Sequence, residues 1–325
     1  MVTGATGFLG SRLIETLSQM GAFKGIIASG RKMREDAFVH PKINYILGDL
    51  TDVPYVSKLV KNIDMVVHAA ALSSPWGADE AFKRANVDSI KNLISASKNE
   101  EVHRIIFIST PSLYFTFADQ VGIDESHKLP APINAYARTK RQAEILLENS
   151  GIPYVILRPR ALIGRGDTVI MPRLIHAHSK GKLAKIGQGT NMVDLTPVSN
   201  VVDAIVLGLS ASGSALNQTY NISNGDPVLL WEKIEMIFEQ LNLPTLSKKL
   251  PLPIVLFFAR MMEFKSNLSS DQSEPVLTVY GVGTLAKTFT LNIDKAKDLL
   301  GYVPRMSVDE AIQEYVEWHI NQEQT

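Results

Sequence analysis

A tyrosine and a lysine stand four residues apart in the sequence YARTK, which begins at Tyr136 and ends at Lys140. On a helix this spacing places the two side chains on one face, one turn apart. A free phenol has a pKa of about 10, and a neighbouring ammonium favours its ionised form. Tyr136 can then pass a proton to or from a hydroxyl or carbonyl oxygen. The spacing alone is common by chance, and an ion pair of Lys140 with Glu144 is the alternative interpretation.

Hydroxyl side chains follow a strand expected at Arg104–Ser109, where the chain continues as Thr110-Pro111-Ser112. Ligands of an open parallel sheet bind beyond the carboxyl ends of its strands. Thr110 or Ser109 can donate a hydrogen bond to a substrate oxygen and hold it against the phenol. Simple termination of the strand by Ser, Thr and Pro is the competing explanation.

Three glycines punctuate the start of the chain, which reads MVTGATGFLG. Gly4 permits a tight turn out of a strand, Gly7 lets the backbone approach a pyrophosphate, and Gly10 lets a helix pack closely on the sheet. The first amides of that helix, at Phe8 and Leu9, would face the phosphates. Because a strand-like segment precedes the glycines and an apolar-periodic helix follows, the segment predicts a dinucleotide site.

Only three residues precede Gly4, whereas a central strand usually has about five. We interpret this as a start codon placed too late or a shortened N-terminus. We expect the first strand to be short and the dinucleotide site to survive.

The choice of dinucleotide depends on the end of the second strand, where the sequence is ASGRK. An acidic residue about 20 positions beyond the glycines would bind the ribose of NAD. Arg31 stands there instead, and the first carboxylate is Glu35. A guanidinium suits a 2′-phosphate, so we expect NADP(H), with NAD(H) as the second choice. A solvated basic loop would give the same pattern.

Short apolar runs alternate with amphipathic helix-period segments through the first two thirds of the chain, which predicts an α/β fold with a doubly wound, Rossmann-type parallel sheet. The expected strands are Lys24–Ala28, Ile43–Leu47, Met65–His68, Arg104–Ser109 and Tyr154–Arg158. The expected helices are Phe8–Met20, Val53–Asn62, Asp79–Lys98 and Asn134–Ser150.

The pattern becomes less regular after Arg158. A helix is expected at Pro172–Lys180 and another at Ser199–Ser210, while strands at Met192–Leu195 and Thr219–Ile222 suggest a return to the sheet. From about Leu230 the chain reads as helical, with an irregular insert at Ser266–Thr290. We therefore expect a dinucleotide-binding domain from residues 1–160 and 192–223, and a smaller, mostly helical substrate lobe from residues 161–191 and 224–325.

Composition excludes several classes of function. The 325 residues carry 33 basic and 33 acidic side chains, without the basic surplus that nucleic-acid binders need. The absence of cysteine rules out disulfides, thiolate catalysis and thiolate metal sites. His176 and His178 point to different faces of a helix, so we expect no metal site.

The most apolar stretch, LPLPIVLFFARMM at Leu250–Met262, is too short to span a membrane and contains Arg260. It fits either a lid over a hydrophobic substrate or, as the favoured interpretation, ordinary core packing. The first residues lack the basic start and apolar run of a signal peptide. We expect a cytoplasmic protein without an integral membrane segment.

Taken in order, these motifs resemble the extended short-chain dehydrogenase/reductases over nearly the whole chain. The motifs are TGATGFLG at 3–10, HAAA at 68–71, ANV at 85–87, Ser109-Thr110 and the Tyr136–Lys140 pair. The resemblance implies that Thr110, Tyr136 and Lys140 are catalytic and that Asn86 supports the geometry. It also implies that Lys140 holds the cofactor ribose. The implied cofactor-binding residues are Gly4, Thr6, Gly7, Phe8, Leu9, Gly10, Arg31, Asp49, Leu50, Ala69, Ala70, Ala71, Ser109, Tyr136, Lys140 and Pro159.

Two branches of that family compete. Nucleotide-sugar epimerases usually carry an asparagine before a Tyr-Gly-Pro segment and an arginine before a later Asp-Phe strand. This chain has RALIGRGD at 160–167 and NMVD at 191–194, without either mark. The segments STPS, LRPR, SNVVDA and YNISNG are instead similar to the 3β-hydroxysteroid dehydrogenase-like branch.

The resemblance therefore predicts an oxidoreductase that interconverts a secondary alcohol and a ketone on a hydrophobic small molecule such as a β-keto acid or a sterol. A nucleotide-sugar epimerase or dehydratase with tightly held NAD is the first alternative. A non-catalytic module that senses NADP(H) is the second. A homodimer is expected by resemblance.

Overall fold

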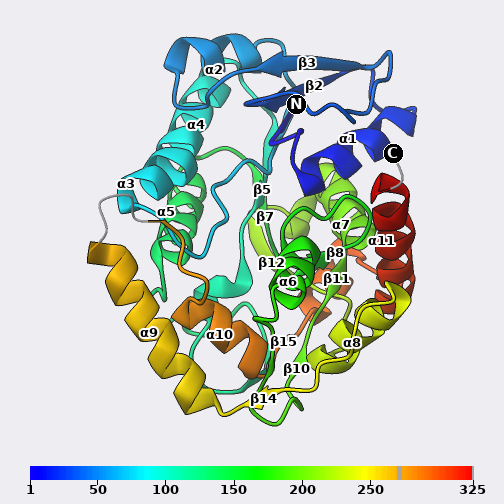
Figure 1. The fold of residues 1–325 in the computed structure, drawn as a ribbon. Helices are drawn as coiled ribbons and strands as arrows, with labels where there is room; N and C mark the ends of the chain where they lie inside the picture. The colour runs from blue at the N-terminus through cyan, green and yellow to red at the C-terminus, as the bar shows by residue number, and fades with distance from the viewer. Residues whose placement is uncertain (269–272, 324–325) are drawn as a thin grey trace.

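The computed structural model describes residues 1–268 and 273–323. Seven strands form its main sheet, in the order β12-β7-β5-β4-β1-β2-β3, and all neighbours pair in parallel (Figure 1). They are β1 (Val2–Thr3), β2 (Ile26–Gly30), β3 (Ile43–Leu47), β4 (Met65–His68), β5 (Arg104–Ile108), β7 (Tyr154–Pro159) and β12 (Gln218–Ile222). The strand order reverses between β1 and β4, and the carboxyl ends there define the expected ligand crevice.

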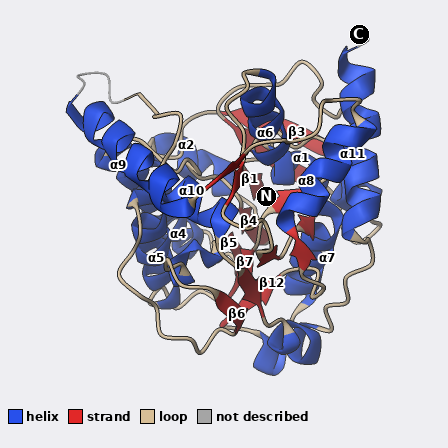
Figure 2. Ribbon diagram, turned by 60° about the horizontal axis from the view of Figure 1, so that its bottom comes forward, coloured by secondary structure: helices blue, strands red, loops and turns tan. Residues whose placement is uncertain are grey.

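Helices cover both faces of this sheet, as a doubly wound fold requires (Figure 2). One face packs against α1 (Phe8–Gln19) and α7 (Val198–Ser210), and the other against α2 (Val53–Val60), α4 (Ser89–Asn99) and α5 (Ala135–Glu148). The short α3 (Asp79–Phe82) runs into α4 through a π-helical turn, Lys83–Asp88. The predicted Rossmann-type fold is thus confirmed, with strand positions accurate to within two residues.

A second group of elements packs beside the carboxyl edge of the sheet. Its helices are α6 (Ile170–Ser179), α8 (Leu230–Gln240), α9 (Leu252–Leu268), α10 (Val279–Ala286) and α11 (Val308–Glu323). A four-stranded sheet joins them, in the order β13 (Val228–Leu229), β10 (Met192–Val193), β15 (Phe289–Leu291) and β6 (Gln120–Ile123). Two-stranded pairs complete it: β8 (Leu162–Ile163) with β11 (Thr196–Pro197), and β9 (Lys185–Ile186) with β14 (Lys249–Leu250).

The first strand is as short as expected but is fully paired. Val2 and Thr3 pair with β2 on one side and with β4 on the other. The amino group of Met1 donates to the carbonyl of Met65 at 2.8 Å, which extends the β4 side of the ladder. The strand thus positions Gly4 at the centre of the sheet.

Two expectations for the second half of the chain were wrong. The strand expected around Met192 belongs to the four-stranded sheet, because β10 pairs with β13 and β15 instead of the main sheet. The segment 266–290, expected to be irregular, contains the end of α9, all of α10 and the first part of β15; its residues 269–272 lie outside the described part.

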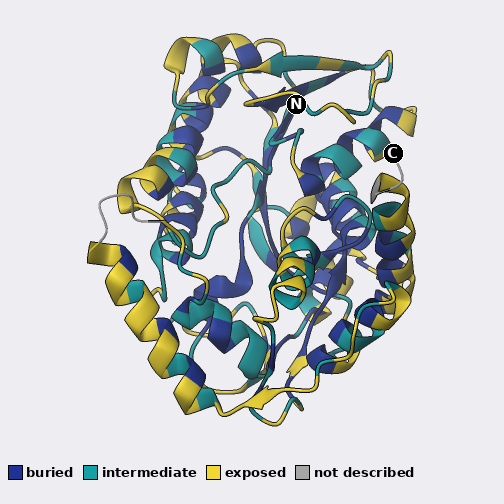
Figure 3. Ribbon diagram, viewed as in Figure 1, coloured by how far each residue is buried: buried dark blue, intermediate teal, exposed yellow. Residues whose placement is uncertain are grey.

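The apolar stretch at Leu250–Met262 is not a core segment, contrary to the favoured interpretation. It forms most of α9, which buries Val255 and Ala259 and turns a largely apolar face outward (Figure 3). Phe257 is 59% exposed and Phe264 is 68% exposed. Among the described residues, no helix combines the length and the apolar character needed to cross a bilayer.

Candidate active site

The glycine turn between β1 and α1 has the geometry of a pyrophosphate cradle. Gly4 adopts a left-handed conformation with φ of 69°, and the amide of Gly7 donates to its carbonyl at 2.9 Å. A Cβ added at Gly10 would lie 2.0 Å from that same carbonyl oxygen, so only glycine fits. Because Gly7 caps α1 without a side-chain hydrogen bond, the first amides of the helix remain available to an anion. The residues present therefore fit a dinucleotide.

Charged side chains line the cavity where β2 and β3 end. Arg31 and Asp49 both line it, and the positive charges of Arg84 and Arg31 contribute to holding the pKa of Asp49 below its usual value, after its hydrogen bonds with Thr51. Arg84, which the sequence analysis did not single out, comes from the π-helical turn before α4. Nothing in its local sequence separates it from a surface arginine, so only the fold reveals it.

Tyr136 and Lys140 project from the first turns of α5. The side chain of Asn134 caps this helix by accepting from the amide of Ala137 at 2.9 Å. Lys140 is buried and donates to the carbonyl of Ile108 at 2.5 Å, with its ammonium 3.9 Å from the centre of the Phe107 ring. The lysine is therefore fixed at the carboxyl end of β5.

The alternative pairing of Lys140 with Glu144 is not what the structure has. Glu144 forms a buried bidentate pair with Arg158, at 2.8 and 2.7 Å, and a further contact with Arg141. Burial opposes ionisation of Glu144, but the hydrogen bonds from Arg158 hold its pKa below the ordinary value. Because this carboxylate is already compensated, the ammonium one turn away keeps its orientation toward the cavity wall.

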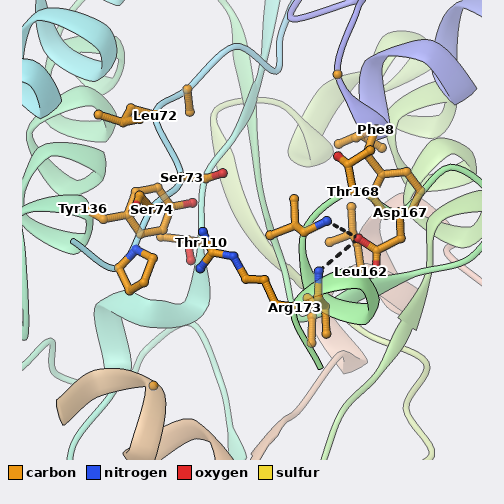
Figure 4. Close-up of a pocket in the computed structure, with 18 of the residues that line it drawn as sticks. Phe8, Leu72, Ser73, Ser74, Thr110, Tyr136, Leu162, Asp167, Thr168 and Arg173 are labelled. Atoms are coloured by element: carbon orange, nitrogen blue, oxygen red, sulfur yellow. Dashed lines mark hydrogen bonds between the residues drawn. The ribbon is translucent and has the colours of Figure 1, made fainter. Parts of the chain in front are cut away.

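A chain of hydroxyl groups lies beside Tyr136. Thr110 donates to Ser112 Oγ at 3.0 Å, and Ser112 Oγ is 2.6 Å from the hydroxyl of Tyr280 on α10. Figure 4 shows Tyr136, Thr110 and Ser74 on one side of the cavity, with Phe8 and Asp167 on the other. Tyr280 was missed by sequence reasoning because it lies in the segment expected to be irregular. Thr110 and Tyr136 both line the cavity, and Thr110 acts to lower the pKa of the phenol.

Asn86 ties the active-site elements together. Its amide nitrogen donates to Thr139 Oγ1 at 3.0 Å and to the carbonyl of Leu72 at 3.2 Å, and its oxygen accepts from the amide of Leu72 at 2.8 Å. The buried side chain thereby fixes the loop after β4 against the α5 residue next to Lys140. This geometry suits a positioning residue.

Burial shifts the titration of both members of the central pair. It raises the pKa of Tyr136 to about 12, partly offset by the hydrogen bond with Thr110. It lowers the pKa of Lys140 to about 7, partly offset by the charge of Glu144. At neutral pH the phenol therefore carries its proton and can donate it, while the lysine exchanges its own readily.

One cavity of about 1410 Å³ unites these features. It runs from the glycine turn past Tyr136 to α6 and α10. The other predicted cofactor residues that line it are Thr6, Phe8, Leu9, Leu50, Ala69, Ala70, Ala71, Ser109 and Pro159. Beyond Pro159 many of the lining side chains are apolar: Leu162, Ile170, Leu174, Val193, Leu195, Val276, Leu277, Val282 and Leu285. Charged or titratable side chains that were not predicted as site residues line this part as well: Arg160, Asp167, Arg173, His176, Lys180, Lys182, Glu274 and Tyr280.

A family model described as the NAD dependent epimerase/dehydratase family matches residues 1–223. The chain belongs to this family. The family name agrees with the dinucleotide cradle, and the expected resemblance to extended short-chain dehydrogenase/reductases is confirmed.

Relatives of this family member cover nearly the whole chain. "Uncharacterized protein YbjS" of Escherichia coli (strain K12) is 32% identical over 98% of this chain and 96% of its own length. A 2-alkyl-3-oxoalkanoate reductase of Stenotrophomonas maltophilia (strain K279a) is 29% identical over 96% of this chain and 97% of its own length. The sequence motifs also resemble this reductase. The NAD⁺ complex of Bordetella bronchiseptica WbmH shares the fold, with a TM-score of 0.78, 20% identity and coverage of 98% and 97%.

The described residues of this family member contain no cluster of potential metal ligands. Of the described residues, no group of three or more histidine, aspartate or glutamate side chains is arranged to hold an ion. His68 is buried at the end of β4, with Nδ1 2.7 Å from Thr3 Oγ1, and its ring stacks on Phe107. It supports the strand that leads into Ala69–Ala71.

The buried His68 should make the protein sensitive to acid. Burial, and to a lesser degree the charge of Lys140, lowers its pKa to about 3. The unfolded chain takes up this proton near pH 6.5, so stability is lost as the pH falls from there toward 3. We expect the free energy of unfolding to drop by about 1–2 kcal/mol between pH 6.5 and 5 through this group. Urea unfolding at several pH values measures the free energy of unfolding, which should not show this decrease in His68→Asn. If that free energy fell equally with pH in the variant and the wild type, the prediction would be contradicted.

Proposed function

We propose that this protein interconverts a secondary alcohol and a ketone on a hydrophobic substrate, with NADP(H) as the preferred cofactor. The observation that carries the proposal is the convergence of Tyr136, Lys140 and Thr110 on a cavity that starts at the glycine turn. A reduced nicotinamide would supply hydride to the carbonyl carbon. Tyr136 delivers the proton to the oxygen, and Thr110 orients that oxygen. Lys140 anchors the ribose, and its ammonium stabilises the phenolate that remains after the proton is delivered.

The apolar side chains that line the cavity beyond Pro159 support a hydrophobic substrate. Ala161 lines the cavity at the position where nucleotide-sugar epimerases usually carry an asparagine. The oxoalkanoate reductase among the relatives is named for a substrate that combines an alkyl chain with a ketone. Together these features support reductase chemistry rather than epimerisation.

A turnover screen tests the proposal directly. Purified protein is assayed with NADPH and with NADH against 3-oxo acids, sterol ketones and sugar nucleotides. We expect cofactor oxidation with a hydrophobic ketone. Tightly retained NAD released on denaturation, together with turnover of a sugar nucleotide without net redox change, would replace the proposal by an epimerase. Binding of NADPH without turnover of any of the three classes would favour the sensing module.

The preference for NADP(H) rests on Arg31 and Arg84. Arg31 follows β2 directly and lines the cavity, whereas the nearby Arg34 is occupied by Asp36 at 2.6 Å. Replacing Arg31 with Ala should raise the KM for NADPH about tenfold, because one charge-assisted contact with the 2′-phosphate is lost, and leave the KM for NADH within about twofold.

Arg34→Ala is the matched control, because that side chain already has a partner. Steady-state kinetics of both variants with both cofactors provide the measurement. If Arg31→Ala raised the two KM values equally, the arginine would not read the 2′-phosphate.

A further inference from the structure

Arg160 is anchored at the boundary between the sheet and the apolar part of the cavity. It follows the last residue of β7; its amide donates to the carbonyl of Ile222 at 3.0 Å, and its carbonyl accepts from the hydroxyl of Thr196. The backbone is thus fixed from two sides. Its side chain extends over the ring of Phe289, 4.7 Å from the ring centre, and lines the cavity.

The guanidinium of Arg160 lacks a hydrogen-bonding partner within the described part of the chain. Its Nε is buried without an acceptor. Arg158, two residues earlier, does have an acceptor, because its guanidinium donates two hydrogen bonds to the carboxylate of Glu144. The residue Arg160 is half-buried, and an anion in the cavity would complete the guanidinium with charge-assisted hydrogen bonds.

The acidic group that acts on Arg160, Asp194, does not fill that role. Asp194 attracts Arg160 electrostatically, but the described residues show no ion pair between them within 4.0 Å. Its Oδ2 accepts instead from the amide of Leu291 at 2.7 Å, and burial raises its pKa to about 6. The terminal donors of Arg160 therefore remain available on the cavity side.

Arg160 is also connected to the reacting end of the cavity. Arg160, Tyr280 and Tyr136 all line this one cavity. The hydroxyl of Tyr280 bonds to Ser112, which accepts from Thr110. An anion on the guanidinium would accordingly occupy the same cavity as the group that Thr110 and Tyr136 act on.

We propose that Arg160 binds the carboxylate of the substrate and so selects an acid over a neutral ketone. A 3-oxo acid of the kind for which the reductase relative is named, or the corresponding 3-hydroxy acid, carries such a group near the reacting carbon. A planar fork matches a carboxylate through two parallel hydrogen bonds. The single carbon between the carboxylate and the reacting carbon keeps the two groups within one end of the cavity. The apolar wall then receives the alkyl chain. This inference rests on the proposed reductase function and specifies its substrate class.

Arg173 is the rival guanidinium in the same cavity. Figure 4 shows it reaching from α6 toward Ser74 and Thr110. Its charge is already compensated, because it pairs with Glu274 at 3.1 Å and its side chain is 52% exposed. Arg160 is therefore the better carboxylate site, and an experiment must compare the two.

The test uses 3-hydroxyoctanoate and its neutral methyl ester, both oxidised with NADP⁺. Replacing Arg160 with Met should raise the KM for the acid about 10- to 100-fold and change kcat/KM for the ester less than threefold. Arg160→Lys should recover part of the loss for the acid. Equal effects on acid and ester, or an acid-specific loss in Arg173→Met instead, would overturn the assignment.

Two additions keep the outcome decisive. Because removal of Arg160 leaves Asp194 buried alone, the double variant Arg160→Met/Asp194→Asn is measured as well, and its far-ultraviolet circular dichroism reports folding. If the wild-type protein oxidised neither compound, the reductase proposal would fail. Calorimetric titration of the wild-type and Arg160→Met proteins with 3-hydroxyoctanoate and its ester would still test the carboxylate site. The assignment requires that the wild type binds the acid more tightly than the ester and that the variant loses this preference.

Discussion

Replacing Tyr136 with Phe should lower kcat about 10²- to 10⁴-fold while the affinity for the cofactor stays within about twofold. The phenol has a pKa raised by burial to about 12, so it holds its proton throughout the neutral range. In the reductive direction it is therefore always ready to donate, and phenylalanine keeps the ring but removes that proton. Single-turnover reduction and fluorescence titration with NADPH measure the two quantities separately.

Tyr280→Phe is the matched control for that experiment. Its hydroxyl reaches Thr110 only through Ser112, so its loss removes one neutral hydrogen bond and should lower kcat less than about tenfold. Turnover of Tyr136→Phe close to that of the wild type would remove Tyr136 as the proton donor. A larger effect from Tyr280 than from Tyr136 would transfer that role to α10.

The elements that could be predicted from sequence are those governed by local pattern. Continuous apolar runs such as Met65–His68 are typical of strands covered on both faces, and the glycines of the first turn favour a tight turn. The Tyr136–Lys140 pair was identifiable because its spacing coincides with a helix that begins beside the end of β5. These features depend on neighbours in sequence, which a reader of the sequence can see.

The features that could not be predicted depend on partners far away in the chain. Tyr280 joins the hydroxyl chain only because α10 packs over the loop after β5, 168 positions from its partner Ser112. Apolar composition similarly suggested a core role for α9, although tertiary packing leaves its Phe257 and Phe264 exposed. The surroundings of Arg160 likewise depend on distant residues, because the fold brings Asp194 and Phe289 to its side chain. No local motif shows whether its guanidinium has an acceptor.

Alanine substitutions at Gly7 and Gly10 should have different effects on cofactor affinity and on the free energy of unfolding. A Cβ at Gly10 would lie 2.0 Å from the carbonyl oxygen of Gly4 and 2.7 Å from Ala5 Cα, and these backbone atoms cannot move unless the turn opens. We expect Gly10→Ala to lower the free energy of unfolding by about 3 kcal/mol or more and to abolish measurable NADPH binding. Urea unfolding without cofactor and calorimetric titration provide the measurements.

Gly7→Ala is the informative counterpart because its backbone, with φ of −90°, accepts alanine and its nearest neighbour would lie 3.3 Å away. Its stability should stay within about 1 kcal/mol of the wild type, since small adjustments relieve that contact. Its affinity for NADPH should nevertheless fall about 10- to 100-fold, because the new methyl group stands where the backbone must approach the pyrophosphate. Normal binding by Gly7→Ala would place the pyrophosphate elsewhere, and wild-type stability of Gly10→Ala would contradict the close contact between α1 and the turn.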